Sequence, residues 1–105
     1  MLADVFRRDS FTLLGYLADV TFEEMYELAR SRKREMPAGS STAALFAGGP
    51  HAIGKKLVEE AAESWMAARF ESDQDLAGEL AQVLYYVACM MAEKDIPLED
   101  VYRQL

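Results

Sequence analysis

The chain has 105 residues, a formal net charge of −7 and a hydrophobic fraction of 51%, with one cysteine and one histidine. This length predicts a single domain, and the apolar content exceeds what a small monomer readily buries, which favours an oligomer. The negative charge argues against nucleic acid or an anionic membrane as a partner. No run approaches the roughly 20 apolar residues of a transmembrane helix, and the lone Cys89 excludes an intrachain disulfide. We therefore expect a cytoplasmic protein.

The first 20 residues show mixed periodicity with Gly15 in the middle, and we expect a short helix or an ordered arm without chemistry of its own. Two arginines precede a short apolar patch in this segment. Its aspartates and the lack of a clean hydrophobic stretch argue against a signal peptide. The main domain is predicted to span residues 21–105.

A helix is predicted over about residues 21–34. Thr21 and Glu24 fit a capping box, in which the hydroxyl and the carboxylate each satisfy a free backbone N–H. The apolar residues that follow at helical spacing are Phe22, Met25, Leu28 and Ala29. The helix ends in a basic run formed by Arg30, Arg32, Lys33 and Arg34. Cations complement the dipole at a helix C-terminus, so this run is interpreted either as a solvated helix end or as a patch that recruits phosphate.

A loop is predicted over residues 37–42, because proline and glycine break the helix there. Its three hydroxyls can bond the backbone or cap a short apolar turn at residues 43–46. A Gly-Gly pair then interrupts the chain again. Pro50 is well placed as the first residue of the next helix, which we expect over about residues 50–70.

The two longest predicted helices, residues 50–70 and 73–94, each combine an apolar stripe with a polar edge. The first stripe consists of Ile53, Leu57, Ala61, Trp65 and Ala68. The second, which follows a further capping box at Ser72 to Asp75, consists of Leu76, Leu80, Val83, Val87 and Met90. Because the apolar stripes of an antiparallel helix pair face each other, the two polar edges are expected to meet along one seam.

Acidic and amide side chains occupy both polar edges. They are Glu59, Glu60 and Glu63 on the first helix and Glu79 and Gln82 on the second, and we call these five residues the polar seam. Like charges three or four residues apart destabilise an isolated helix by roughly a few tenths of a kcal/mol, which a bound cation would offset. These all-oxygen donors suit Mg²⁺ or Mn²⁺ rather than Zn²⁺. Mg²⁺ can both activate a water and stabilise charge on a polyphosphate.

Other interpretations of these residues remain open at this point. Glutamates at this spacing also occur on solvated helices, as in a non-catalytic helical dimerisation module. A ferritin-like di-iron centre needs Glu-x-x-His motifs, and His51 does not complete one. Trp65 and Tyr86 are interpreted as core or core-edge residues, and Cys89 as a small buried hydrophobe.

The C-terminal residues predict one more short element. Pro97 ends the long helix, and residues 99–105 can add a last helical turn through Val101 and Leu105. No stretch shows strand-like alternation of useful length, and no internal repeat is present. The fold is therefore predicted to be all-α.

Five motifs follow one another along residues 21–105. They are Thr21-Phe22-Glu23 with Leu28 and Arg32-Lys33, Pro37-x-Gly39-Ser40-x-Thr42-x-x-Leu45, Ile53-x-Lys55-Lys56-x-x-Glu59-Glu60-Ala61-x-Glu63, Glu79-x-x-x-Val83-Leu84-Tyr85, and Leu98-Glu99-Asp100-Val101. Together they resemble the MazG-like all-α pyrophosphohydrolases, and among these the phosphoribosyl-ATP pyrophosphohydrolases of histidine biosynthesis. The Gly-Ser-x-Thr loop and the Lys-Lys pair distinguish this branch from other MazG-like enzymes.

The resemblance implies Mg²⁺-dependent hydrolysis of phosphoribosyl-ATP to phosphoribosyl-AMP and pyrophosphate, with Mn²⁺ as an alternative ion. It implies a homodimer whose helices combine into a MazG-like bundle. Carried over by position, the metal ligands would be Glu60, Glu63, Glu79 and Gln82. Glu59 and Glu60 would be catalytic, with Glu59 as a ligand or as a base that orients the attacking water. The residues facing the substrate's phosphates would be Lys55, Lys56, Arg32, Lys33, Ser40 and Thr42.

The chain departs from this family's pattern at three positions. Ser41 replaces an aromatic residue, Gln82 replaces the usual Asp, and Tyr86 replaces a common His. A Gln oxygen can still bind Mg²⁺, but it carries no charge. A MazG-type nucleotide pyrophosphohydrolase of other specificity and the non-catalytic module are the alternatives.

Overall fold

The computed structural model describes residues 20–105, and this part of the chain contains four helices and no strand. The helices are α3 (Phe22–Glu35), α4 (Ser41–Phe70), α5 (Asp73–Glu93) and α6 (Leu98–Tyr102). The predicted all-α class is confirmed, whereas the expectation of a helix or arm before residue 20 falls outside the described residues. Within residues 20–105, no helix is both long and apolar enough to cross a membrane.

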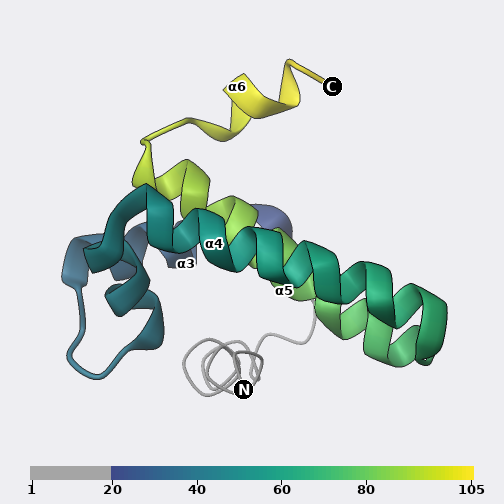
Figure 1. Cartoon of the computed structure of the whole chain (residues 1–105). Coiled ribbons are helices and arrows are strands. Elements are labelled where there is room, and N and C mark those ends of the chain that lie inside the picture. The colour runs from purple at the N-terminus through teal and green to yellow at the C-terminus, as the bar shows by residue number, and fades with distance from the viewer. Residues whose placement is uncertain (1–19) are drawn as a thin grey trace.

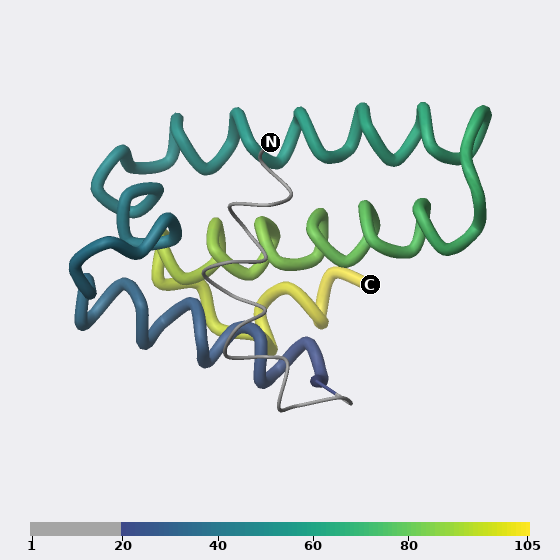
Figure 2. The backbone as a smooth tube through the Cα atoms, turned by 90° about the horizontal axis from the view of Figure 1, so that it is seen from below, coloured from purple at the N-terminus to yellow at the C-terminus, as the bar shows by residue number. Residues whose placement is uncertain are grey.

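The antiparallel pair α4–α5 is the longest part of the fold (Figure 1). The two helices lie side by side and are joined by a short turn after Phe70 (Figure 2). Helix α3 packs mainly against α5, at the end of the pair that is remote from this turn. The end of the pair next to the turn therefore extends beyond α3.

Local capping explains where α3 begins and ends. The Thr21 Oγ1 accepts from the backbone N–H of Glu24 at 3.1 Å, and the Glu24 carboxylate accepts from the backbone N–H of Thr21 at 2.9 Å. This is the predicted capping box. The helix ends at Glu35, and its C-cap Met36 has a φ of 46°, in the left-handed region. The predicted range of 21–34 is confirmed to within one residue at each end.

Helix α4 begins earlier than predicted. The Ser40 hydroxyl accepts from the backbone N–H of Ala43 at 3.0 Å, as an N-cap does. Ser41 and Thr42 consequently lie in the first turn of α4, and the prediction that residues 37–42 form one loop is wrong over its last two residues.

A kink divides α4 into two segments. Gly49 has a φ of 75°, which residues with a β-carbon adopt only with strain, and this interrupts the helix. Pro50 follows and starts the long second segment, where its missing N–H costs no helical hydrogen bond. The long segment therefore covers the predicted residues 50–70.

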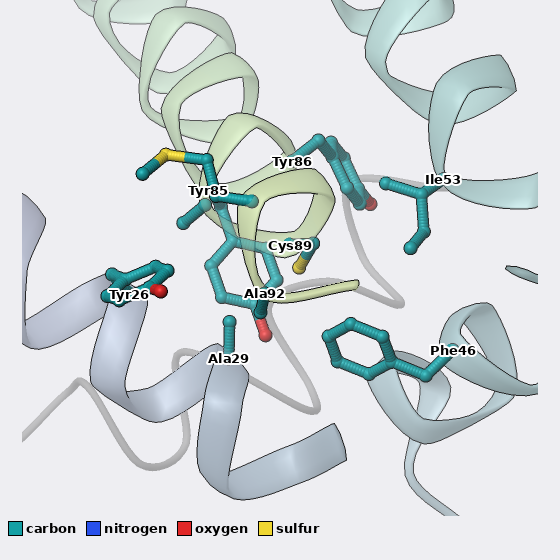
Figure 3. Close-up of a cluster of buried hydrophobic side chains, with 10 residues drawn as sticks. Tyr26, Ala29, Phe46, Ile53, Tyr85, Tyr86, Cys89 and Ala92 are labelled. Atoms are coloured by element: carbon teal, nitrogen blue, oxygen red, sulfur yellow. The ribbon is translucent and has the colours of Figure 1, made fainter. Parts of the chain in front are cut away.

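The hydrophobic core lies where α5 meets both α3 and the first half of α4. Its labelled side chains are Tyr26 and Ala29 from α3, Phe46 and Ile53 from α4, and Tyr85, Tyr86, Cys89 and Ala92 from α5 (Figure 3). The rings of Tyr85 and Tyr86 meet edge to face with centroids 5.9 Å apart. Cys89 is fully buried, as predicted.

The predicted apolar stripe of residues 50–70 is wrong beyond its first half. Ile53 is fully buried, but Trp65 is 69% exposed, contrary to the core position expected for it. The face of α4 that is buried runs instead through Glu60, Ser64 and Ala67. Periodicity alone selected the wrong face because this helix is apolar on more than one side.

The stripe predicted for α5 is also rotated. Leu80 is 47% exposed, whereas Gln82, Tyr85 and Tyr86 are buried. Helix α5 contacts α4 on one side and α3 on another, so its buried face lies between these two neighbours. The Ser72 N-cap is present, since its hydroxyl accepts from the backbone N–H of Asp75 at 3.1 Å.

Candidate metal centre

Three carboxylates of the polar seam converge between α4 and α5. Glu60, Glu63 and Glu79 each offer one oxygen, and these three oxygens lie within 4.8 Å of one another. Glu60 and Glu63 come from neighbouring turns of α4, and Glu79 comes from the facing turn of α5. We call these residues the carboxylate cluster. The convergence of the two polar edges, expected from the antiparallel pairing, is therefore present.

Glu60 is the buried member of the cluster. Its side chain has no exposed surface, and neither carboxylate oxygen has a hydrogen-bond partner. An isolated buried carboxylate is costly by several kcal/mol. Burial is the largest cause that raises the pKa of Glu60 to about 7, and the carboxylates of Glu63 and Glu79 add to it. Lys56 lowers this pKa by a smaller amount.

Gln82 is also buried, with 1% of its surface exposed. Its amide nitrogen donates to Oε1 of Glu79 at 3.1 Å, whereas its amide oxygen is buried without a hydrogen-bond partner. Buried oxygens that lack partners thus belong to both sides of the seam. A divalent cation that prefers oxygen ligands would satisfy them, so the residues fit Mg²⁺ or Mn²⁺.

Glu59 and the two lysines lie on the adjoining part of α4. The Lys56 ammonium is 3.6 Å from Oε1 of Glu59, one turn away. Lys56 is partly buried and Lys55 is exposed. Positive and negative groups therefore lie close together on this part of α4.

Three of the residues predicted to face phosphates make contacts within the fold. The Arg32 guanidinium, which is buried, donates to the Ser40 hydroxyl at 3.3 Å and so joins α3 to the start of α4. The hydroxyl of Thr42 is buried and accepts from the Tyr85 hydroxyl at 3.0 Å, which joins α4 to α5. Tyr85 lies six residues after Glu79, or about 9 Å further along α5.

Lys33 is not brought to the carboxylate cluster. Its ammonium donates to the backbone carbonyls of Ala92 at 3.2 Å and Glu93 at 2.7 Å, and lies 3.9 Å from the Glu93 carboxylate. These are the last carbonyls of α5, which a cation stabilises. Ala92 is 13 residues from Glu79, which corresponds to about 20 Å along the helix. Within the basic run of α3, Arg32 therefore contacts the start of α4, whereas Lys33 contacts the end of α5.

The core or core-edge position expected for Tyr86 is confirmed, whereas a contact of the neighbouring tyrosine was not predicted. Tyr86 is buried beside Glu60, and burial, followed by the Glu60 charge, raises the pKa of its hydroxyl far above the ordinary value. Tyr86 therefore remains a neutral phenol. The Tyr85–Thr42 hydrogen bond was not predicted from the sequence. Tyr85 and Tyr86 are adjacent in an apolar stretch of the sequence. Nothing in that stretch indicates which tyrosine donates a hydrogen bond to another helix.

A family model described as phosphoribosyl-ATP pyrophosphohydrolase matches residues 22–105, a range that includes all four described helices. The chain belongs to this family. The resemblance that the five motifs indicate is confirmed. Phosphoribosyl-ATP pyrophosphohydrolases are metal-dependent enzymes of histidine biosynthesis. The protein is thus a hydrolase that acts on a phosphoanhydride.

Proposed function

We propose that the protein hydrolyses phosphoribosyl-ATP to phosphoribosyl-AMP and pyrophosphate with Mg²⁺ at the carboxylate cluster, and that residues 21–105 form the domain that does so. The observation that supports this most directly is the convergence of Glu63 and Glu79 on Glu60, which is fully buried with neither oxygen hydrogen-bonded. Such a group needs a positive partner, and the substrate's polyphosphate needs the same counter-charge.

Glu60, Glu63 and Glu79 would hold the cation. When bound, Mg²⁺ supplies the positive charge that activates a water and stabilises charge on the leaving pyrophosphate. Its ligands come from two helices that are packed along their length, so their relative positions are fixed before substrate binds.

Glu59 and two lysines of α4 would handle the proton and the phosphates. Glu59 lies at the edge of the cluster, where its carboxylate can orient the attacking water and accept its proton. Lys56 lies 3.6 Å from that carboxylate, and with Lys55 it would contact phosphate oxygens. These two lysines are nearer in sequence to the cluster than any other predicted phosphate-binding residue.

The remaining predicted phosphate contacts have different positions. Arg32, Ser40 and Thr42 stay predictions as phosphate contacts, and their hydrogen bonds support a role in holding the start of α4 beside the site. Lys33 is tied to the end of α5 by two carbonyls. It could face a phosphate at the cluster only after leaving that position, so we do not include it in the site.

The exposed apolar surface of α4 and α5 supports a homodimer. Large apolar side chains that are 47–69% exposed gather on these two helices, and they are Val58, Trp65, Met66, Phe70, Leu80 and Leu84. The end of the pair next to its turn extends beyond α3 (Figure 2). A second copy that packs its own α4–α5 pair on this surface would complete a four-helix bundle.

A substrate panel tests the reaction. Pyrophosphate release is measured from phosphoribosyl-ATP, ATP and the deoxynucleoside triphosphates, each with Mg²⁺ and with excess EDTA. We expect release from phosphoribosyl-ATP that stops with EDTA and exceeds release from the other nucleotides by at least tenfold in kcat/KM. Preferential turnover of deoxynucleoside triphosphates would instead support a MazG-type enzyme of other specificity.

A further inference from the structure

A pocket of about 230 Å³ lies between the C-terminal ends of α3 and α5, and we call it the basic pocket. The residues that line it are Arg30, Lys33 and Arg34 of α3, Ala92 of α5, and Asp95 of the turn after α5. It is separate from the carboxylate cluster of the same chain, because Ala92 lies about 20 Å further along α5 than Glu79. Pockets for drug-sized ligands have roughly 300–1,000 Å³, so the basic pocket fits a smaller group.

The lining of the basic pocket carries a positive formal charge. Arg30 is three residues from Lys33 and four from Arg34, so the three cations lie on one face of α3. Like charges at this spacing repel one another, and a bound anion would offset the repulsion. Asp95 is the single carboxylate among the lining residues. The charge therefore favours an anion as the ligand.

Lys33 joins the two walls of the pocket. Its ammonium donates to the carbonyls of Ala92 at 3.2 Å and Glu93 at 2.7 Å and lies 3.9 Å from the Glu93 carboxylate. The Ala92 carbonyl also accepts from the backbone N–H of Asp95 at 3.3 Å. Donors of the protein thus occupy these carbonyls at the end of α5, whose partial negative charge would otherwise repel an anion.

The two arginines are the cations that a ligand can reach. The guanidinium carbon of Arg30 lies 5.7 Å from the centre of the Tyr26 ring, and the Tyr26 hydroxyl donates to the Ile96 carbonyl at 2.8 Å. Arg30 therefore rests on a ring that is itself attached to the chain after α5. Arg34 is exposed and makes no ion pair with any residue in the range 20–105.

We propose that the basic pocket binds one phosphate group through the guanidinium groups of Arg30 and Arg34. The planar fork of a guanidinium matches two oxygens of a phosphate, and the pocket volume suits one such group rather than a whole nucleotide. The ligand is either a free phosphate or phosphate monoester, or the ribose phosphate of phosphoribosyl-ATP held by a second copy of the chain. The site requires no cation at the carboxylate cluster, so it is independent of the proposed function.

Titration of the ¹⁵N-labelled full-length chain with inorganic phosphate tests the proposal by NMR. EDTA is present, and chloride keeps the ionic strength constant. Arg30→Gln and Arg34→Gln each remove one cation of the pocket, and Asp95→Asn removes its carboxylate. Arg103→Gln is the matched control, because Arg103 is exposed just after α6 and does not line the pocket. The spectra without phosphate show whether each variant is folded.

We expect saturable shifts of the amide signals of residues 30–34 and 92–95. Arg30→Gln and Arg34→Gln should each weaken binding at least about tenfold, because a charge-assisted hydrogen bond is lost. Asp95→Asn should strengthen binding, since its carboxylate repels the anion. Absence of saturable shifts at these residues, equal weakening by Arg34→Gln and Arg103→Gln, or weaker binding by Asp95→Asn would overturn the proposal.

Two further measurements identify the source of the phosphate group. If it belongs to phosphoribosyl-ATP, Arg34→Gln should raise the KM for this substrate with little change in kcat. If it is a free phosphate monoester, ribose 5-phosphate should produce the same shifts as inorganic phosphate, and the KM should stay at the native value. A native protein that binds phosphate in the basic pocket but does not hydrolyse phosphoribosyl-ATP would overturn the proposed function and leave this site standing.

Discussion

Glu60 is fully buried and has three neighbouring carboxylates. Ionising its side chain at neutral pH therefore costs considerable free energy. Its pKa of about 7 means that the metal-free folded protein keeps a proton on this carboxyl that the unfolded chain releases near pH 4.5. Between these two values the folded state binds more protons than the unfolded state. Stability from this group is therefore present below about pH 4.5 and is lost as the pH rises through 7.

The first prediction concerns Glu60→Gln in the absence of metal. The amide of the variant does not titrate. When the pH is raised from 5 to 8, the free energy of unfolding of the variant should therefore rise by about 2 kcal/mol relative to that of the native protein. Urea unfolding of both proteins at the two pH values, with EDTA and at one protein concentration, measures this difference. A native-to-variant difference in unfolding free energy that is equal at pH 5 and pH 8 would contradict it.

At the scale of the helices, side-chain hydrogen bonds join the start of α4 to both α3 and α5. Arg32 of α3 donates to Ser40, and Tyr85 of α5 donates to Thr42 at 3.0 Å in the buried interior. Buried hydrogen bonds contribute about 1 kcal/mol each, and a buried group left without its partner costs about 1–3 kcal/mol. These contacts bring the first segment of α4 to the half of α5 that contains the core.

A double-mutant cycle on Thr42→Val and Tyr85→Phe is the second prediction. Each single replacement should lower the unfolding free energy by about 1–2 kcal/mol, and the double variant should lose less than the sum by about 1 kcal/mol. Chemical denaturation of the four proteins measures the coupling. Strictly additive losses would show that the two hydroxyls do not stabilise the fold through each other.

Features that depend on residues close together in the sequence could be predicted, whereas features that depend on packing between helices could not. The limits of α3 were predictable because the capping box of Thr21 and Glu24 involves only neighbouring residues. The meeting of Glu60, Glu63 and Glu79 was predictable from helical spacing and antiparallel pairing.

The orientation of the long helices was not predictable in the same way. The second segment of α4 has apolar residues around most of its circumference, so its buried face depends on which helix packs there. The attachment of Lys33 to the last carbonyls of α5 and the burial of Gln82 likewise depend on tertiary packing, which periodicity does not encode.

At the scale of the whole molecule, the single chain leaves a large apolar surface on its longest helices. Trp65 and Phe70 are each 69% exposed on α4, and Leu84 is 50% exposed on α5. Several large apolar side chains exposed on the same pair of helices are typical of an interaction site in soluble proteins. A two-fold contact between copies would place the same residues against each other from both sides.

The third prediction is that Trp65→Glu weakens dimerisation at least about tenfold, because a carboxylate would be buried in an apolar interface. Light scattering coupled to size exclusion, over a range of concentrations, measures the mass. Leu105→Glu is the control, since it adds the same charge at a fully exposed residue beyond α6. A native mass of one chain, or equal effects of the two variants, would contradict the proposed interface.

The measurement that tests the proposed function most directly is pyrophosphate release from phosphoribosyl-ATP by the native protein and by Glu60→Gln, each with and without Mg²⁺. We predict release by the native protein only when Mg²⁺ is present, and a rate at least about 100-fold lower for Glu60→Gln, whose neutral side chain weakens the cation site. Release by Glu60→Gln at the native rate, or by the native protein in EDTA, would contradict a metal centre built on Glu60.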